Sequence, residues 1–238
     1  MTFVSNFTCV GEFHRVFEHP IKSKPDVNIF GENPKLVKLR YSLIEEESKE
    51  FITAVKENDI VEMIDALADI DYVVYGAGHA FGINMDSMLS LARLPSPQKV
   101  DPKTYFARIS PDLVATTCKR FEQLLRQLSS AIDSQNMIEI AIVLLKIVEE
   151  TYAVAGDLGI DLDKAFGLVH ESNMTKACIN EQEANQSLDQ YMLDTTIYKD
   201  PSIKRSSDGK YWIVYDRATG KTLKSKFYRP VDLKPLLG

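Results

Sequence analysis

Two long helical patterns separated by a very short break constrain the fold of this chain more than any other feature. Apolar residues recur every three or four positions from about residue 35 to 56, and again from about 60 to 81. Only Asn58 and Asp59 interrupt the pattern, and Gly82 ends it. With so short a connection, two helices of this length pack side by side as a helical hairpin. We therefore predict an all-α body.

The same pattern returns 77 residues further along the chain. Gly82-Ile83 recurs as Gly159-Ile160, and the break at residues 58–59 lands on residues 135–136. A second helical stretch occupies about 111–158 around that break. Two unrelated hairpins of similar length would also align in part. The coincidence of breaks and turns without a gap favours an internal duplication instead.

The first hairpin concentrates carboxylates on its two helices. Residues three and four apart share a helix face, and like charges at that spacing repel one another. Such a cluster needs solvent, partner groups or a cation to offset the repulsion, and hard oxygen ligands suit Mg²⁺ or Mn²⁺. The acidic residues are Glu46, Glu47 and Glu50 in the first helix and Glu62, Asp65 and Asp69 in the second.

The second hairpin has not kept these groups. If the duplication holds, this copy retains the fold without the metal site, and Lys146 brings an ammonium group to the position of Asp69. The aligned pairs are Glu47 with Leu124, Glu50 with Gln127, Asp65 with Ile142 and Asp69 with Lys146.

Charge and composition exclude several classes of protein. From Lys199 onward the chain contains ten Lys and Arg against four Asp and Glu, whereas the preceding residues contain 18 against 30. An acidic body is unsuited to nucleic acid; the basic tail suits a small polyphosphate or is simply a solvated charged segment. No transmembrane stretch, secretory signal or CxxC pair is present. We expect a reduced, cytoplasmic protein without membrane or nucleic-acid partners.

Several ordered motifs resemble those of a known family. They are "EFHRVF", "LRYSLIEEESKEF", "DALADIDYVVYG", "GIDLDKAFGLVHESNMTK" and a late "DGK…GKTLKSKFYRPVDL". Together they resemble the all-α NTP pyrophosphatases, and within them most closely the MazG-like and dimeric-dUTPase-like branch. The resemblance covers nearly the whole chain except roughly residues 92–147, which single-copy members lack.

The resemblance implies a fold and an activity. The expected fold is a MazG-like helical bundle with a four-helix core, followed by a small, basic, β-like C-terminal tail. The expected reaction is Mg²⁺-dependent cleavage of a nucleoside triphosphate between its α- and β-phosphates, which yields a nucleoside monophosphate and pyrophosphate. No GxxxxGK[ST] loop is present, so a P-loop mechanism is not expected.

The resemblance also implies site residues. The family signature is ExxE followed by ExxD, and Glu47 and Glu50 fit its first half. For the second half, Glu62 and Asp65 fit the letters, whereas the "YVVYG" anchor places Asp69 at the final aspartate and Ala66 where many members have glutamate. In that register either Asp65 or Glu62 would replace the glutamate. The expected metal ligands are Glu46, Glu47, Glu50, Asp65 and Asp69, with Glu62 the weakest candidate; Glu47 or Glu46 is expected to take a proton from water.

A second set of residues is expected to contact the substrate phosphates. By resemblance these are Asn173 and Lys176 of the "HESNMTK" element, with Lys224 and Tyr228 of the tail as further candidates. That element follows the second hairpin in this chain, so the copy without carboxylates is expected to deliver it to the first copy. One chain would then imitate a family dimer, as a pseudo-dimeric monomer or within a homodimer.

These expectations divide the chain into three parts. Residues 1–94 form the catalytic helical repeat, 95–180 the degenerate repeat, and 181–238 the basic tail or lid. Two alternatives to a nucleotide-pool hydrolase remain open: a phosphoribosyl-ATP pyrophosphohydrolase, and a catalytically inactive nucleotide-binding regulator of the same fold. The base and sugar of the substrate are not determined by the sequence.

Overall fold

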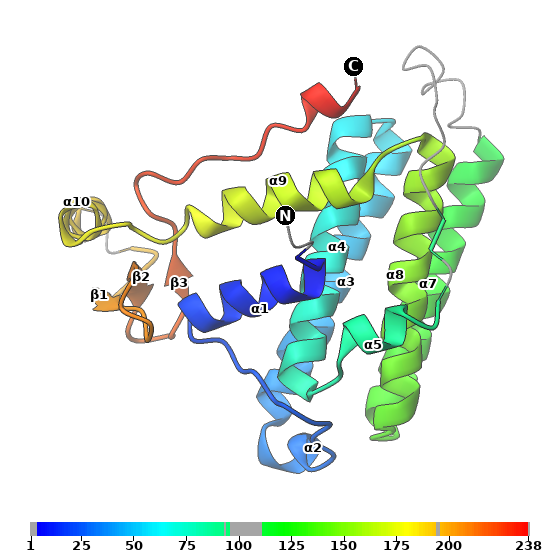
Figure 1. The fold of residues 1–238 in the computed structure, drawn as a ribbon, viewed down its shortest axis with the longest axis horizontal. Helices are drawn as coiled ribbons and strands as arrows, with labels where there is room; N and C mark the ends of the chain where they lie inside the picture. Colours follow the sequence, from blue (N-terminus) through cyan, green and yellow to red (C-terminus); the bar gives the residue numbers. More distant parts are fainter. Residues whose placement is uncertain (1–3, 93, 96–110, 194–195, 238) are drawn as a thin grey trace.

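The computed structural model describes residues 4–92, 94–95, 111–193 and 196–237, and this part of the chain is mostly helical. Four long helices stand side by side, two shorter ones cross them, and a small sheet lies at one end (Figure 1). The predicted class, a helical bundle with a small β-containing C-terminal tail, is confirmed. None of the described helices is both long and apolar enough to cross a membrane.

The first hairpin consists of α3 (Pro34–Glu57) and α4 (Ile60–Phe81). Helix α3 ends because Asn58 adopts a left-handed conformation (φ 58°), and α4 begins because the Asp59 side chain accepts hydrogen bonds from the backbone N–H groups of Val61 and Glu62. Gly82, with φ 76°, ends α4. These caps fix the length and register of the two helices that carry the carboxylates.

The second hairpin, α7 (Pro111–Asp133) and α8 (Met137–Leu158), repeats these caps. Gln135 has φ 53°, and Gly159 has the same φ of 76° as Gly82. After α4 the Ile83 N–H donates to the Gly78 carbonyl at 2.8 Å, and after α8 the Ile160 N–H donates to the Ala155 carbonyl, also at 2.8 Å. The two hairpins therefore share their local backbone geometry at an offset of 77 residues.

Both hairpins bury their apolar faces in one continuous core. Phe51 of α3 and Phe121 of α7 pack with ring centroids 5.0 Å apart, and both are fully buried. A polar contact also joins the hairpins, because the Thr151 hydroxyl of α8 donates to the buried Asp71 carboxylate of α4 at 2.7 Å.

Two shorter helices cross the first hairpin. Helices α1 (Asn6–Val16) and α9 (Leu162–Met174) both contact α4 and each other (Figure 1). Although α9 follows the second hairpin in sequence, it packs on the first. By contrast, α8 is contacted by α5 (Met85–Leu89), a helix of five residues.

The C-terminal region contains more structure than the sequence predicted. The predicted β-like tail contains β2 (Trp212–Asp216) and β3 (Thr222–Leu223), and these strands are joined by β1 (Pro201–Arg205) in an antiparallel sheet of order β1-β2-β3. Helix α10 (Glu181–Met192) packs on β1 and β2. The chain then returns along α9 and ends in a 3₁₀ turn, Lys234–Leu237, against the bundle (Figure 1). A short helix, α2 (Ile29–Glu32), precedes α3.

Candidate active site

The hairpin α3–α4 brings the predicted carboxylates into one electrostatic cluster. Glu47 interacts electrostatically with the carboxylates of Asp69, Glu50, Glu46 and Asp65. Helix spacing alone accounts for the members on each helix, and the antiparallel pairing brings the two sets together. The five predicted metal ligands are therefore neighbours in space.

Burial and mutual repulsion alter the acidity of this cluster. Burial first, and the charges of Asp69, Glu50, Glu46 and Asp65 next, raise the pKa of Glu47 to about 8. Burial and the Asp65 carboxylate raise the pKa of Asp69 to about 7. A carboxylate that holds its proton near neutral pH is a better base than an ordinary glutamate once it is ionised.

In the second acidic helix, Asp65 lies beside Ala66, the position at which the family resemblance implies a glutamate. Ala66 is buried and supplies only a methyl group. Asp65 is partly buried, and burial together with Glu62 and Glu50 raises its pKa. Glu62 is exposed, and it lines a pocket of about 370 Å³ with Glu46 and Glu50. The structure thus places Glu62 at the solvent edge of the cluster.

The donor set fits a hard divalent cation. Oδ1 of Asp65 is buried without a hydrogen-bond partner among the described residues, which leaves a desolvated anionic oxygen inside the cluster. All other candidate ligands are carboxylates, the donors that Mg²⁺ prefers. Within the described ranges no three such groups are already spaced as ligands of a single ion, so side-chain rotation must accompany binding.

Cationic groups from the C-terminal half reach the same place. Lys176 lies just after α9, and its ammonium group interacts electrostatically with the carboxylates of Asp69 and Glu47. The ammonium group of Lys224 interacts in the same way with Asp69. Burial lowers the pKa of Lys176, with a further lowering by Lys224. The backbone N–H of Ser225 donates to the Lys176 carbonyl at 3.1 Å, which fixes the tail beside the end of α9.

The other two predicted phosphate contacts occupy different surroundings. Asn173 is buried and hydrogen-bonds the hydroxyl of Tyr72 on α4. Tyr228 accepts a hydrogen bond of 3.3 Å from Ser172, and its ring lies 4.4 Å from the Lys224 ammonium. Asn173 is therefore placed to orient Tyr72, whereas Tyr228 is placed to orient Lys224.

A buried arginine near the site was not singled out by the sequence analysis. Arg40 of α3 is 6 % exposed, and its Nε has no partner among the described residues. Burial lowers its pKa to about 10. The Arg40 guanidinium interacts electrostatically with the imidazoles of His14 and His19. His19 also interacts with the Lys176 ammonium group. The only sequence signal was a charged residue on an otherwise apolar helix face.

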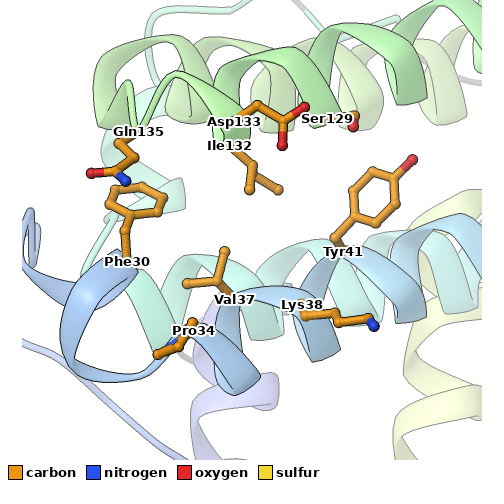
Figure 2. Close-up of a pocket in the computed structure, with 9 residues that line it drawn as sticks. All are labelled: Phe30, Pro34, Val37, Lys38, Tyr41, Ser129, Ile132, Asp133 and Gln135. Carbon is orange, nitrogen blue, oxygen red and sulfur yellow. The ribbon is translucent and has the colours of Figure 1, made fainter.

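A separate pocket of about 390 Å³ lies between α3 and α7 (Figure 2). Phe30, Val37 and Tyr41 on one side face Ile132 and Asp133 on the other. It contains none of the predicted site residues. The predicted carboxylates therefore lie outside this pocket.

Comparison with known proteins agrees with the site. The family model described as phosphoribosyl-ATP pyrophosphohydrolase matches residues 10–92, the segment that contains the second half of α1 and all of α3 and α4. With the helical fold and the facing carboxylates, this match defines the chain as a member of the all-α NTP pyrophosphatase superfamily. Membership supports a pyrophosphohydrolase-type activity on a nucleotide in general terms.

One relative extends over almost the entire chain. It is an uncharacterized protein of Acanthamoeba polyphaga mimivirus, 35% identical over 247 residues, which cover 98% of this chain and 96% of the relative. The sequence similarity therefore spans both hairpins and the C-terminal region of this chain. No solved structure shows a significant match to the chain.

Proposed function

We propose that this protein is a Mg²⁺-dependent nucleoside triphosphate pyrophosphohydrolase that acts on a small nucleotide, with a deoxynucleoside triphosphate as the first candidate substrate. The observation that supports this function is that a cluster of carboxylates lies close to lysine side chains from a distant part of the chain. Five carboxylates of α3 and α4 lie beside Lys176 and Lys224 of the C-terminal half. A metal-bound polyphosphate requires both kinds of group at once.

Each residue has a defined part in the proposed reaction. Glu46, Glu47, Glu50, Asp65 and Asp69 would hold the divalent cation. When bound, Mg²⁺, or Mn²⁺ in its place, neutralises the triphosphate and the leaving pyrophosphate. Lys176 and Lys224 bind the phosphates, and Tyr228 orients Lys224. Water attacks the α-phosphorus, its proton passes to Glu47 with Glu46 as the alternative base, and the bond to the β-phosphate oxygen breaks.

The duplication gives the second hairpin a role in this site. We propose that α7 and α8 arose from α3 and α4, since their caps agree at an offset of 77 residues. The second copy then lost its carboxylates but still carries α9 and Lys176 to the first copy. One chain thereby imitates a dimer with one working site, in line with the proposed division at residues 94 and 180.

The experiment that tests this function measures pyrophosphate release from a panel of NTPs and dNTPs with Mg²⁺. Wild type is compared with Glu47→Gln, Asp69→Asn and the control Glu45→Gln, which changes a surface residue paired with Lys49. We expect base-selective release that is lost in the two site variants and kept in the control. Nucleotide binding with no release from any substrate would instead identify a regulator.

Phosphoribosyl-ATP is the second candidate substrate, because the matching family model bears its name. The C-terminal tail favours the triphosphate, since it adds Lys224 to the site and enzymes of the histidine pathway generally lack such a tail. Adding phosphoribosyl-ATP to the same panel decides between the two. Release from it alone would overturn the proposed substrate but not the proposed chemistry.

A further inference from the structure

The second hairpin has a pocket at the place that corresponds to the active site. This pocket, of about 450 Å³, lies on α7 and α8. Its volume is in the range of small-ligand sites. Three of its lining residues stand 77 positions after three of the carboxylates: Gln123 after Glu46, Gln127 after Glu50, and Lys146 after Asp69.

The chemistry of this second pocket is the reverse of the first. Amides and an ammonium replace the carboxylates, so a divalent cation has no ligand set here. Leu124 supplies an apolar surface where the first hairpin has Glu47. Any ligand of this pocket must bind without a metal.

The charges of the pocket balance and leave specific groups available. Arg120 is paired with Glu150 at 3.2 Å. Among the described residues no ion pair involves Lys146 or Glu149, although both line the pocket. Four or so negative charges of a metal-free triphosphate would meet two carboxylates here, which opposes its binding. A single phosphate can pair with Lys146 alone.

Gln127 supplies the most specific recognition group. Its Oε1 is buried and has no hydrogen-bond partner among the described residues, and an unpaired buried acceptor costs free energy. When the side chain turns into the pocket, a ligand that offers an N–H group satisfies this oxygen, and every nucleobase carries such a group. Glu149 can accept hydrogen bonds from sugar hydroxyls, and Leu124 can contact the flat base.

We propose that the pocket between α7 and α8 is a second, metal-independent nucleotide site that binds a nucleoside monophosphate. The choice of monophosphate rests on the proposed function, because it is the product of that reaction. Lys146 binds its phosphate, Glu149 its sugar and Gln127 its base. The degenerate repeat thereby senses the product that the first repeat releases.

The test measures binding of AMP, GMP, CMP, UMP and their deoxy forms to the full chain in EDTA, by calorimetry. EDTA removes the cation that the first site requires. The variants are Lys146→Glu and Gln127→Met, with the matched control Lys119→Glu, an exposed lysine of α7 outside the pocket lining, and the first-site variant Asp69→Asn.

We expect at least one monophosphate to bind wild type, Lys119→Glu and Asp69→Asn alike, and at least tenfold more weakly to Lys146→Glu and Gln127→Met. Gln127→Met removes the unpaired oxygen at nearly constant size, so it should not lower the melting temperature. It therefore decides the question if Lys146→Glu fails to fold. Absence of binding to wild type, or binding lost in Asp69→Asn but kept in Lys146→Glu, overturns the proposal.

The result is independent of turnover. If no substrate gives pyrophosphate while a monophosphate binds in EDTA through Lys146, the proposed function fails and the second site stands. If pyrophosphate is released but no monophosphate binds, the reverse holds.

Discussion

The Thr151 hydroxyl of α8 donates a hydrogen bond of 2.7 Å to Oδ1 of Asp71 in α4, and both side chains are fully buried. Burial raises the pKa of Asp71 well above its usual range, whereas the bond from Thr151 lowers it. The other carboxyl oxygen has no partner among the described residues. This fully buried polar contact thus joins α4 of the first hairpin to α8 of the second.

Removing that contact should weaken the pairing of the hairpins. Thr151→Val keeps the shape of the side chain but leaves the Asp71 carboxyl without its donor, which costs about 1–3 kcal/mol. For a chain of this size the melting temperature should fall by roughly 2–4 °C per kcal/mol. Thr151→Ser retains the hydroxyl and serves as the control. Equal melting temperatures for Thr151→Val and wild type would contradict this role.

Glu47→Gln should abolish catalysis and stabilise the protein in the absence of metal. Loss of the general base lowers kcat roughly 10²- to 10⁴-fold. Above the raised pKa of Glu47, at about pH 9, the same change removes one charge from a cluster whose members repel each other, so the melting temperature in EDTA should rise at that pH. Mg²⁺ should raise the melting temperature of wild type more than that of the variant. Differential scanning calorimetry with and without Mg²⁺ measures both effects.

Lys176→Ala should weaken phosphate binding while leaving metal binding intact. A charge-assisted hydrogen bond contributes about 1.5–3 kcal/mol, or roughly 10- to 150-fold in KM or turnover. The control is Lys164→Ala, an exposed lysine near the start of α9, the helix that Lys176 follows. Steady-state kinetics and Mn²⁺ binding by electron paramagnetic resonance separate the two properties. Unchanged kinetics in Lys176→Ala would remove this residue from the site.

Acid should destabilise the protein through His14. Burial, and then the charge of Arg40, lower its pKa to about 3, with His19 and His79 acting in the same direction. Because the unfolded imidazole has a pKa near 6.5, the unfolded state binds more protons as the pH falls below that value, and stability declines. The loss from this group is roughly 2 kcal/mol at pH 5.

A His14 variant isolates that contribution from other titrating groups. His14→Gln keeps a polar side chain that can donate to the Pro20 carbonyl, which the imidazole Nδ1 contacts at 2.9 Å. Its free energy of unfolding should vary less between pH 7 and pH 5 than that of wild type. Urea denaturation at the two pH values gives the comparison, and parallel pH dependence would exclude His14 as the source.

The backbone of the hairpins was predictable because its signals are local. Asn58, Asp59 and Gly82 mark helix ends by their own conformational preferences, and the structure uses all three as caps. Helix α10 was missed because residues 181–192 carry few apolar side chains, so its periodicity is weak. Strand β1 was missed because its pairing with β2 depends on residues that are distant in sequence.

The candidate site was predictable only in part for the same reason. Helix spacing groups Glu47 with Glu50. No local pattern shows that Lys176, which follows the second hairpin in sequence, lies close to Asp69 of the first hairpin. That approach was expected from family resemblance alone. The burial of Arg40 and Asn173 depends on how α1 and α9 cross α4, which no single segment encodes.

The packing of α9 on the first hairpin has a consequence for the newly made chain. A ribosome that has released α3 and α4 has already produced every carboxylate of the site, yet the lysines at 176 and 224 are still to be translated. Nascent chains and C-terminally truncated fragments would therefore carry a cluster of repelling charges without its counter-charges. On the proposed function, Lys176 and Lys224 bind the phosphates, so substrate binding would require nearly the whole polypeptide to have emerged.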